Sequence, residues 1–141
     1  MSMSYKLSGT ENIYNYMTGG HAVATLKSCT GKHYTYRFQA PDGRKPGDDM
    51  LFIYVLIDGS LWNYVGMYRN RDFKLTQKSR YDRTSPIVRG VCFILKMMLL
   101  SGFADDRVEL YHEGICSRCG RPLTNPESIE IGIGPKCREL R

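Results

Sequence analysis

The sequence predicts an α+β domain in which a small, mostly antiparallel sheet of two hairpins packs against one main helix. In regions 22–38 and 51–68, two segments rich in β-branched and aromatic residues flank a short turn, as in a hairpin. Residues 86–100 place apolar side chains at helical spacing, and a cysteine pattern occupies the C-terminal end. For a chain of 141 residues, we expect a core domain over 1–107 and a cysteine-containing module over 108–141, packed together as one unit.

The N-terminal region predicts a short helix followed by the first hairpin. Ser8 and Glu11 have the spacing of a capping box, and Gly19 and Gly20 supply a stop, so the helix should cover about residues 9–17. Strands over 22–28 and 33–38 then flank a turn at residues 29–32. The second strand alternates, so three aromatic residues should share one face: Tyr34, Tyr36 and Phe38.

The next region predicts a second hairpin and one further strand. Residues 51–57 are continuously apolar, which is typical of a strand buried on both faces. Asp58, Gly59 and Ser60 should turn the chain into a strand over 62–68. Residues 73–78 then alternate, and we expect a strand that displays Lys74 and Lys78 outward.

The main helix is expected over residues 86–100. Ser85 suits the N-cap and Pro86 the first helical position, while Ser101 and Gly102 should end the helix. Its wide apolar face, which includes Cys92, should form the centre of the core against the sheet. A last short strand should cover 108–112.

Four residues near the C-terminus have the spacing of ligands for one tetrahedral metal ion. Cys116 and Cys119 form a Cys-x-x-Cys-Gly knuckle, Cys137 follows after 17 intervening residues, and three residues separate His112 from Cys116. Thiolates and imidazole nitrogens are the usual donors of a closed structural zinc site. We therefore predict one structural Zn²⁺ held by His112, Cys116, Cys119 and Cys137, in a module of the zinc-ribbon or treble-clef type.

The fourth ligand is open to alternatives. His112 is favoured because it is close in sequence and should share a strand face with Val108 and Leu110. A water molecule or another chain could take its place, as could one of four other residues: His21, His33, Cys29 and Cys92. Between the knuckle and Cys137 we expect a short helix that begins near residues 124–126 and ends at Gly132. A turn at 134–135 should then set Cys137 near a helix N-terminus, where the positive end of the dipole favours a thiolate.

The C-terminal segment resembles an uncharacterised domain family that is common in bacteriophage and prophage genomes. The residues that carry the resemblance are His112, Gly114, Cys116, Cys119 to Ile129, Gly132 to Pro135 and Cys137. Weaker similarity extends upstream, to the first hairpin and to residues 73–80. The resemblance implies a phage-encoded protein that works in the bacterial cytoplasm, and it implies no reaction.

The net charge of +6 is concentrated in one region. Residues 69–89 contain seven basic and two acidic side chains, a net charge of +5. Such a cluster suggests a polyanion or an acidic protein surface as partner. Aromatic residues interleave with the cations, so this region could neutralise phosphates and stack on bases. We call the predicted binding residues the basic segment: Arg69, Arg71, Lys74, Lys78, Arg80, Tyr81 and Arg83.

These observations favour a non-enzymatic protein that binds DNA or RNA through the basic segment. The alternative is a protein–protein inhibitor of a host nucleic-acid machine or defence complex, resembling an anti-CRISPR protein in its role, because Tyr and Arg are common interface anchors. A catalytic site is not expected, since four protein ligands leave no open position on the metal. The longest apolar run is interrupted by Arg89 and Lys96, and the N-terminus lacks a signal-peptide layout, so we expect a cytoplasmic protein with no membrane partner. The sequence does not specify the oligomeric state.

Overall fold

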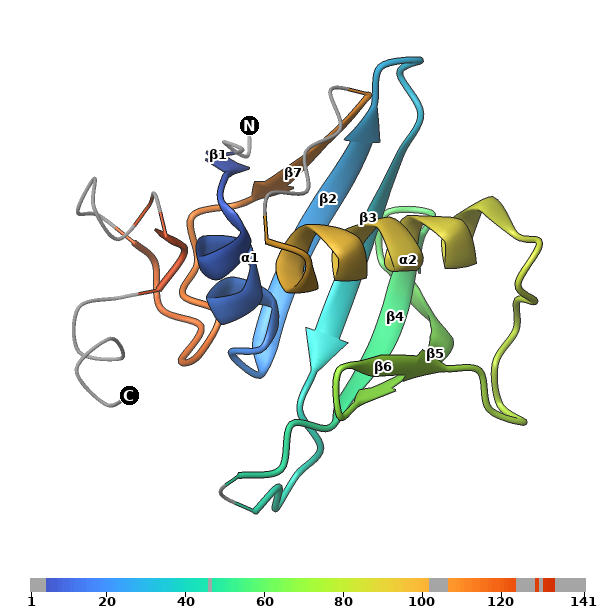
Figure 1. Cartoon of the computed structure of the whole chain (residues 1–141), viewed down its shortest axis with the longest axis horizontal. Helices are drawn as coiled ribbons and strands as arrows, with labels where there is room; N and C mark the ends of the chain where they lie inside the picture. Colours follow the sequence, from blue (N-terminus) through green and yellow to red (C-terminus); the bar gives the residue numbers. More distant parts are fainter. Residues whose placement is uncertain (1–4, 46, 102–106, 124–128, 130, 134–141) are drawn as a thin grey trace.

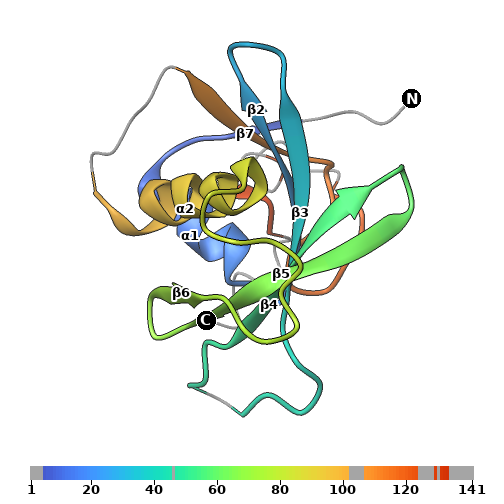
Figure 2. The same cartoon turned by 90° about the vertical axis from the view of Figure 1, so that its right-hand side faces the viewer.

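The computed structural model describes residues 5–45, 47–101, 107–123, 129 and 131–133. These residues form one seven-stranded sheet with two helices on one of its faces (Figures 1 and 2). The strand order is β1-β7-β2-β3-β4-β5-β6, and all neighbouring pairs are antiparallel. The α+β class is therefore confirmed, but the sheet is larger than the two predicted hairpins.

Both hairpins form where the sequence predicts them. The first joins β2 (His21–Ser28) to β3 (His33–Gln39), and the second joins β4 (Leu51–Ile57) to β5 (Leu61–Arg69). In β3, Tyr36 and Phe38 are fully buried on the face expected for them. The strand β4 differs from its prediction, because its buried residues alternate with half-buried ones and only one face lies in the core.

Three further strands enlarge the sheet. The strand β1 (Tyr5–Leu7) was not expected from the sequence, and it pairs with β7 (Val108–His112), which also pairs with β2. The last strand, β6 (Asp72–Lys74), has three residues instead of the six expected over 73–78. Because β7 lies between β1 and β2, the predicted domain boundary at 107/108 falls at the start of a strand of the central sheet.

The two helices are α1 (Thr10–Met17) and α2 (Pro86–Leu99). The predicted cap of α2 is present, since the Ser85 hydroxyl accepts a hydrogen bond from the Ile87 N–H at 3.2 Å. The capping box predicted for α1 is absent: Gly9 is the N-cap and no side chain caps the helix. None of the described helices is long and apolar enough to span a bilayer.

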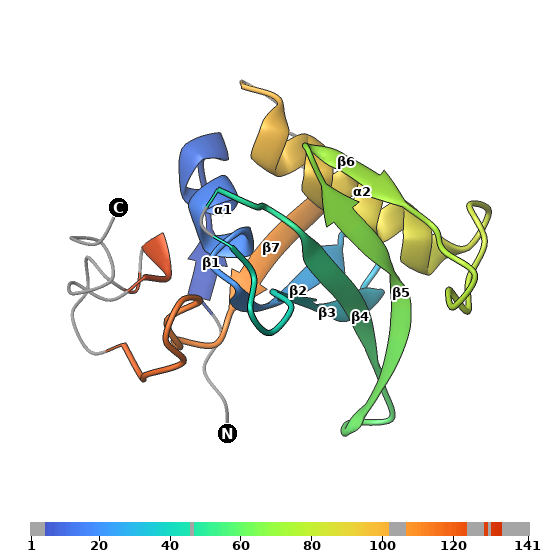
Figure 3. The same ribbon diagram turned by 90° about the horizontal axis from the view of Figure 1, so that it is seen from below.

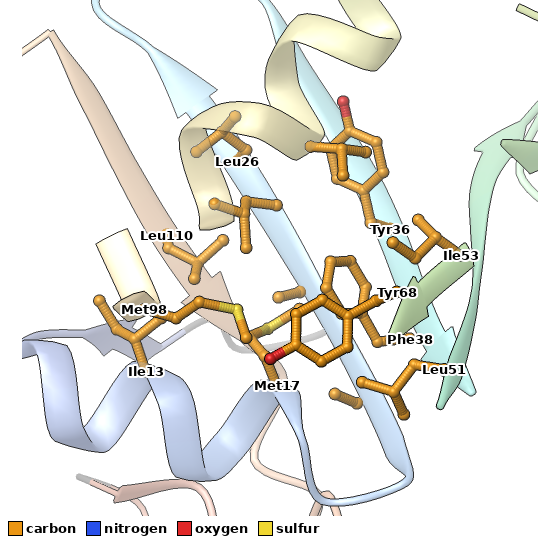
Figure 4. Close-up of a cluster of buried hydrophobic side chains, with 14 of the residues drawn as sticks. Ile13, Met17, Leu26, Tyr36, Phe38, Leu51, Ile53, Tyr68, Met98 and Leu110 are labelled. Carbon is orange, nitrogen blue, oxygen red and sulfur yellow. The ribbon is translucent and has the colours of Figure 1, made fainter. Parts of the chain in front are cut away.

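The core lies between α1, α2 and one face of the sheet (Figure 4). The buried residues of α2 include Val91, Ile94 and Met98, as its spacing predicts, whereas Cys92 is only half-buried. Tyr36 crosses the core and donates a hydrogen bond from its hydroxyl to the Ile87 carbonyl at 2.7 Å. The two helices thus cover one face of the sheet, and within the described part of the chain no helix covers the opposite face of β3, β4 and β5. Figure 3 shows β4 and β5 extending away from the helices as a twisted ribbon.

Candidate functional site

The Cys116–Gly120 segment folds as a tight turn that presents a sulfur atom to backbone donors. The Arg118 N–H donates to Cys116 Sγ at 3.4 Å, and the Gly120 N–H donates to the Cys116 carbonyl at 2.9 Å. Gly120 has a φ of 77°, a conformation that glycine adopts without strain. An N–H donated to sulfur stabilises a thiolate, so the geometry of this turn suits a metal-binding knuckle.

The two cysteines of the turn differ in exposure. Cys116 is fully buried and Cys119 is exposed. The turn is closed by a backbone hydrogen bond of 2.9 Å from the Cys116 N–H to the Arg121 carbonyl and by a bridge between Ile115 and Pro122. Backbone hydrogen bonds therefore define the course of the chain between residues 115 and 122.

His112 is fully buried at the end of β7, and both of its ring nitrogens are in hydrogen bonds. The Gly114 N–H donates to Nδ1 at 3.0 Å, so Nε2 carries the proton and donates to the Ile129 carbonyl at 2.6 Å. The ring lies between those of Tyr5 and Tyr16, with centroid separations of 5.6 and 5.2 Å. Burial lowers the pKa of His112, and the hydrogen bond to Ile129 offsets part of this effect.

The structure does not bring His112 into a metal-binding group with Cys116 and Cys119. Among the described residues, no three His, Cys, Asp or Glu side chains lie together in a way that could hold an ion. Cys137, the third predicted thiol, lies outside the described residues, as do 124–128 and 134–135, on which the predicted helix start and turn fall. His112 stays a predicted ligand, and binding a metal would require it to exchange one of its two hydrogen bonds.

The alternative fourth ligands lie elsewhere in the fold. His21 and His33 are exposed at opposite ends of the first hairpin, Cys29 is exposed in its turn, and Cys92 is half-buried on α2. His21 Nδ1 is 3.2 Å from Gln39 Nε2. All four residues are far from the knuckle in the sequence. In space, the backbone of His21 contacts the knuckle, because the His21 N–H donates to the Ser117 carbonyl at 2.7 Å.

The knuckle packs against the turn between α1 and β2 through close backbone contacts. A Cβ atom at Gly19 would overlap Ser117, and one at Gly132 would overlap the Tyr16 ring. The Ser117 N–H donates to the Gly132 carbonyl at 3.1 Å. Residues 129 and 131 are helical and Gly132 has a φ of 75°, which agrees with the predicted helix end. Glycines at these two positions thus allow the C-terminal segment to approach the core.

The basic segment runs along one edge of the sheet, and its members differ in their surroundings. Arg69 forms an ion pair with Asp48 at 3.0 Å, and the hydrogen bond from Arg69 lowers the pKa of that carboxyl group. Arg71 donates to the Leu99 carbonyl at 3.4 Å. Tyr81 is half-buried against the core, and its hydroxyl accepts from Asn63 at 3.1 Å, so it does not point freely into solvent.

The remaining four cations of the basic segment are exposed. Within the described part of the chain they make no ion pair, so their charges are not neutralised there: Lys74, Lys78, Arg80 and Arg83. The segment is held beside β5 by a hydrogen bond of 3.4 Å from the Arg80 N–H to the Tyr64 carbonyl. A second contact of 3.2 Å joins the Thr76 hydroxyl to the Tyr64 hydroxyl. The exposed cations therefore lie next to the strand that carries Tyr64.

The face of the sheet opposite the helices carries a cluster of aromatic residues that the sequence did not predict as a site. We call this cluster the aromatic face: Arg37, Phe52, Tyr54, Trp62 and Tyr64, all half-buried. The Arg37 guanidinium lies 4.9 Å from the Tyr54 ring centroid and 4.7 Å from that of Trp62. The Tyr64 ring is 5.8 Å from Tyr54 and 6.2 Å from Phe52, in edge-to-face geometry.

Two features concealed the aromatic face at the sequence level. The uninterrupted apolar run of β4 gave no sign that Phe52 and Tyr54 point away from the core. In β5, a register irregularity pairs Tyr54 with Tyr64 but Ile53 with Gly66, so Val65 is an additional residue that breaks the alternation. One local signal pointed to the aromatic face: Arg37 alternates with Tyr36 and Phe38 along its strand, so its side chain should point to the opposite face of the sheet.

Comparison with known proteins gives one match. Residues 109–141 match DUF6011, a family of unknown function. The resemblance of the C-terminal segment to an uncharacterised family is therefore confirmed, over a region that begins within β7 and contains the cysteine pattern. No curated protein and no solved structure matches the chain.

Proposed function

We propose that this protein binds nucleic acid, and that the exposed cations of the basic segment contact the phosphates. The observation that supports this proposal is the position of Lys74, Lys78, Arg80 and Arg83, which lie exposed beside β5 without carboxylate partners in the described part. Arg69 contributes less, because Asp48 already neutralises it. Phosphate contacts by lysine and arginine dominate the affinity of such interfaces.

We further propose that one zinc ion stabilises the C-terminal segment, with Cys116, Cys119 and Cys137 as thiolate ligands and His112 as the fourth candidate. The donor set fits zinc, and the hydrogen bond from Arg118 to Cys116 Sγ is of the kind that stabilises a metal thiolate. The ion would have a structural role, because the proposed function contains no reaction.

The place of action follows from the resemblance that the sequence shows. A phage-encoded protein would work in the cytoplasm of its bacterial host, on host or phage nucleic acid. In that setting, the alternative function is occlusion of a host nucleic-acid machine or defence complex. It predicts tight binding to one protein and little binding to free DNA or RNA.

A charge-reversal experiment tests the proposed function. We expect Lys78→Glu with Arg80→Glu to abolish binding to labelled DNA and RNA in an anisotropy assay, because two phosphate contacts become repulsive. The matched control is Lys32→Glu with Lys45→Glu, which changes the net charge equally at two exposed positions outside the basic segment.

The control variant should keep most of the affinity of the unmodified protein. Equal loss in both variants would show that net charge alone drives binding and would remove the basic segment from the account. Absence of binding by the unmodified protein would contradict the proposed function. In that case, a pull-down from nuclease-treated host lysate tests the inhibitor alternative.

A further inference from the structure

We propose that the aromatic face is a stacking platform for the bases of single-stranded nucleic acid. This inference rests on the proposed function, since the phosphates of the same strand would contact the basic segment. It goes further by assigning a second binding surface and by naming the class of ligand. Single strands are favoured because the faces of bases in a duplex are already stacked and cannot reach a protein sheet.

The geometry of the aromatic face provides the first support. Trp62, Tyr54 and Tyr64 come from adjacent strands of a hairpin, and alternation with the buried Ile53 and Val55 places them on the side of the sheet away from the core. Their rings are half-buried, so part of each remains accessible to solvent. The edge-to-face contact between Tyr54 and Tyr64 fixes their relative orientation. Rings held in this way stack on a base with little loss of side-chain entropy.

Arg37 provides the second support. Its guanidinium contacts the Tyr54 and Trp62 rings, and its Nε atom is buried without a hydrogen-bond partner in the described part. Neither of the two ion pairs among the described residues involves Arg37. A positive charge held among rings, with no carboxylate partner in the described part, attracts an anionic strand.

The surrounding charge favours nucleic acid over a protein partner. Lys27 is exposed on the same side of β2, and Lys74 of the basic segment lies opposite Met67. Glu109 is an outward carboxylate of β7, but its ion pair with Lys6 at 3.1 Å offsets its charge. The basic segment is joined to Tyr64 of the aromatic face by the hydrogen bonds of Arg80 and Thr76. Phosphate-binding and base-stacking groups therefore lie side by side.

Trp62 makes the inference directly measurable, because it is the one tryptophan of the chain. The zinc-loaded protein is titrated with a twelve-residue oligothymidine and with an oligomer of equal length whose sites are all abasic. Both ligands carry the same phosphates, and only the first can stack. We expect oligothymidine to quench Trp62 fluorescence and to bind at least about fivefold more tightly than the abasic oligomer.

Two single variants test whether the bases stack on the aromatic face. Tyr54→Leu should weaken oligothymidine binding about fivefold or more and leave binding of the abasic oligomer unchanged. Tyr34→Leu is the matched control, because Tyr34 is a half-buried tyrosine of the same sheet that faces the helix side, packed against the core. The control should not change the preference for bases over abasic sites. Circular dichroism confirms that each variant is folded.

The outcomes separate this inference from the proposed function. Equal affinity for the two oligomers, with Trp62 fluorescence unchanged, would overturn the stacking platform and leave phosphate binding intact. Equal weakening by Tyr54→Leu and Tyr34→Leu would also overturn it. If neither oligomer binds, the inference fails, and the proposed function fails with it only if duplex DNA and RNA also do not bind.

Discussion

His112 is a buried residue with a different set of contacts from those that its sequence spacing predicts. The pattern indicates a metal ligand, and alternation along β7 correctly places its side chain on the same face as Leu110. In the structure its ring joins β7 to the chain at Gly114 and Ile129 by two hydrogen bonds. The partner carbonyl lies 17 residues away in sequence, and no local pattern identifies such a contact.

We expect His112→Ala to destabilise the protein and to lose the one equivalent of zinc, because His112 is the predicted fourth ligand. The substitution removes a buried ring and leaves the Gly114 N–H and the Ile129 carbonyl without their partner, which should cost about 2–4 kcal/mol in the free energy of unfolding. Urea denaturation measures the stability, and atomic absorption measures the metal.

The control for this prediction is His21→Ala, which alters an exposed histidine. It should change neither the stability nor the zinc content. Retention of a full equivalent of zinc by the His112 variant would exclude His112 as the fourth ligand.

At the scale of elements, the sequence predicts what depends on nearby residues. Both hairpins and both described helices are recovered, because their turns, the Ser85 cap of α2 and their apolar spacing are local features. The strand β1 was missed because three residues carry no periodic signal and pair with a strand at the other end of the chain. The strand β6 is shorter than expected because the chain leaves the sheet after Lys74, where the Ser79 hydroxyl accepts from the Thr76 N–H at 2.8 Å.

The contact between α2 and β3 is tight enough to reverse an ordinary helix preference. Alanine normally stabilises a helix interior relative to glycine by about 1 kcal/mol. A Cβ at Gly90 would overlap the Tyr36 hydroxyl, which is fixed by its hydrogen bond to Ile87. We therefore expect Gly90→Ala to lower the free energy of unfolding by about 1–3 kcal/mol, measured in urea.

A double variant checks the cause of this loss. Tyr36→Phe removes the hydroxyl group that would overlap the new Cβ. The further cost of Gly90→Ala should therefore be smaller in the Tyr36→Phe background than in the unmodified protein. An equal or larger cost in that background would show that the overlap is not the reason.

At the scale of the whole molecule, the described part of the C-terminal segment contacts the core at several points. The strand β7 lies within the sheet, and close contacts of Gly19 with Ser117 and of Gly132 with Tyr16 join the two parts. The expectation that core and module pack as one unit stays a prediction, since Cys137 and its neighbours lie outside the described residues. The zinc ligands therefore have to be tested in solution.

We expect removal of zinc to destabilise the entire chain. A structural zinc site typically contributes roughly 10 kcal/mol or more of binding free energy to folding. Cys116→Ser, or a strong chelator, should abolish metal binding and lower the melting temperature of the single unfolding transition. The control is Cys29→Ser, at an exposed thiol in the β2–β3 turn, which should change neither quantity. An unchanged melting temperature in the Cys116 variant would argue against a structural metal.

The most direct test of the proposed function is the affinity of the zinc-loaded protein for labelled single- and double-stranded DNA and RNA across a salt series. The account predicts micromolar or tighter binding at low salt that weakens steeply as salt rises, with a slope of about −0.9 per phosphate contact on duplex DNA and about −0.7 on single strands. Charge reversal at Lys78 and Arg80 should abolish that binding. No binding at low salt, or binding that does not depend on salt, would contradict the proposal that the basic segment contacts phosphates.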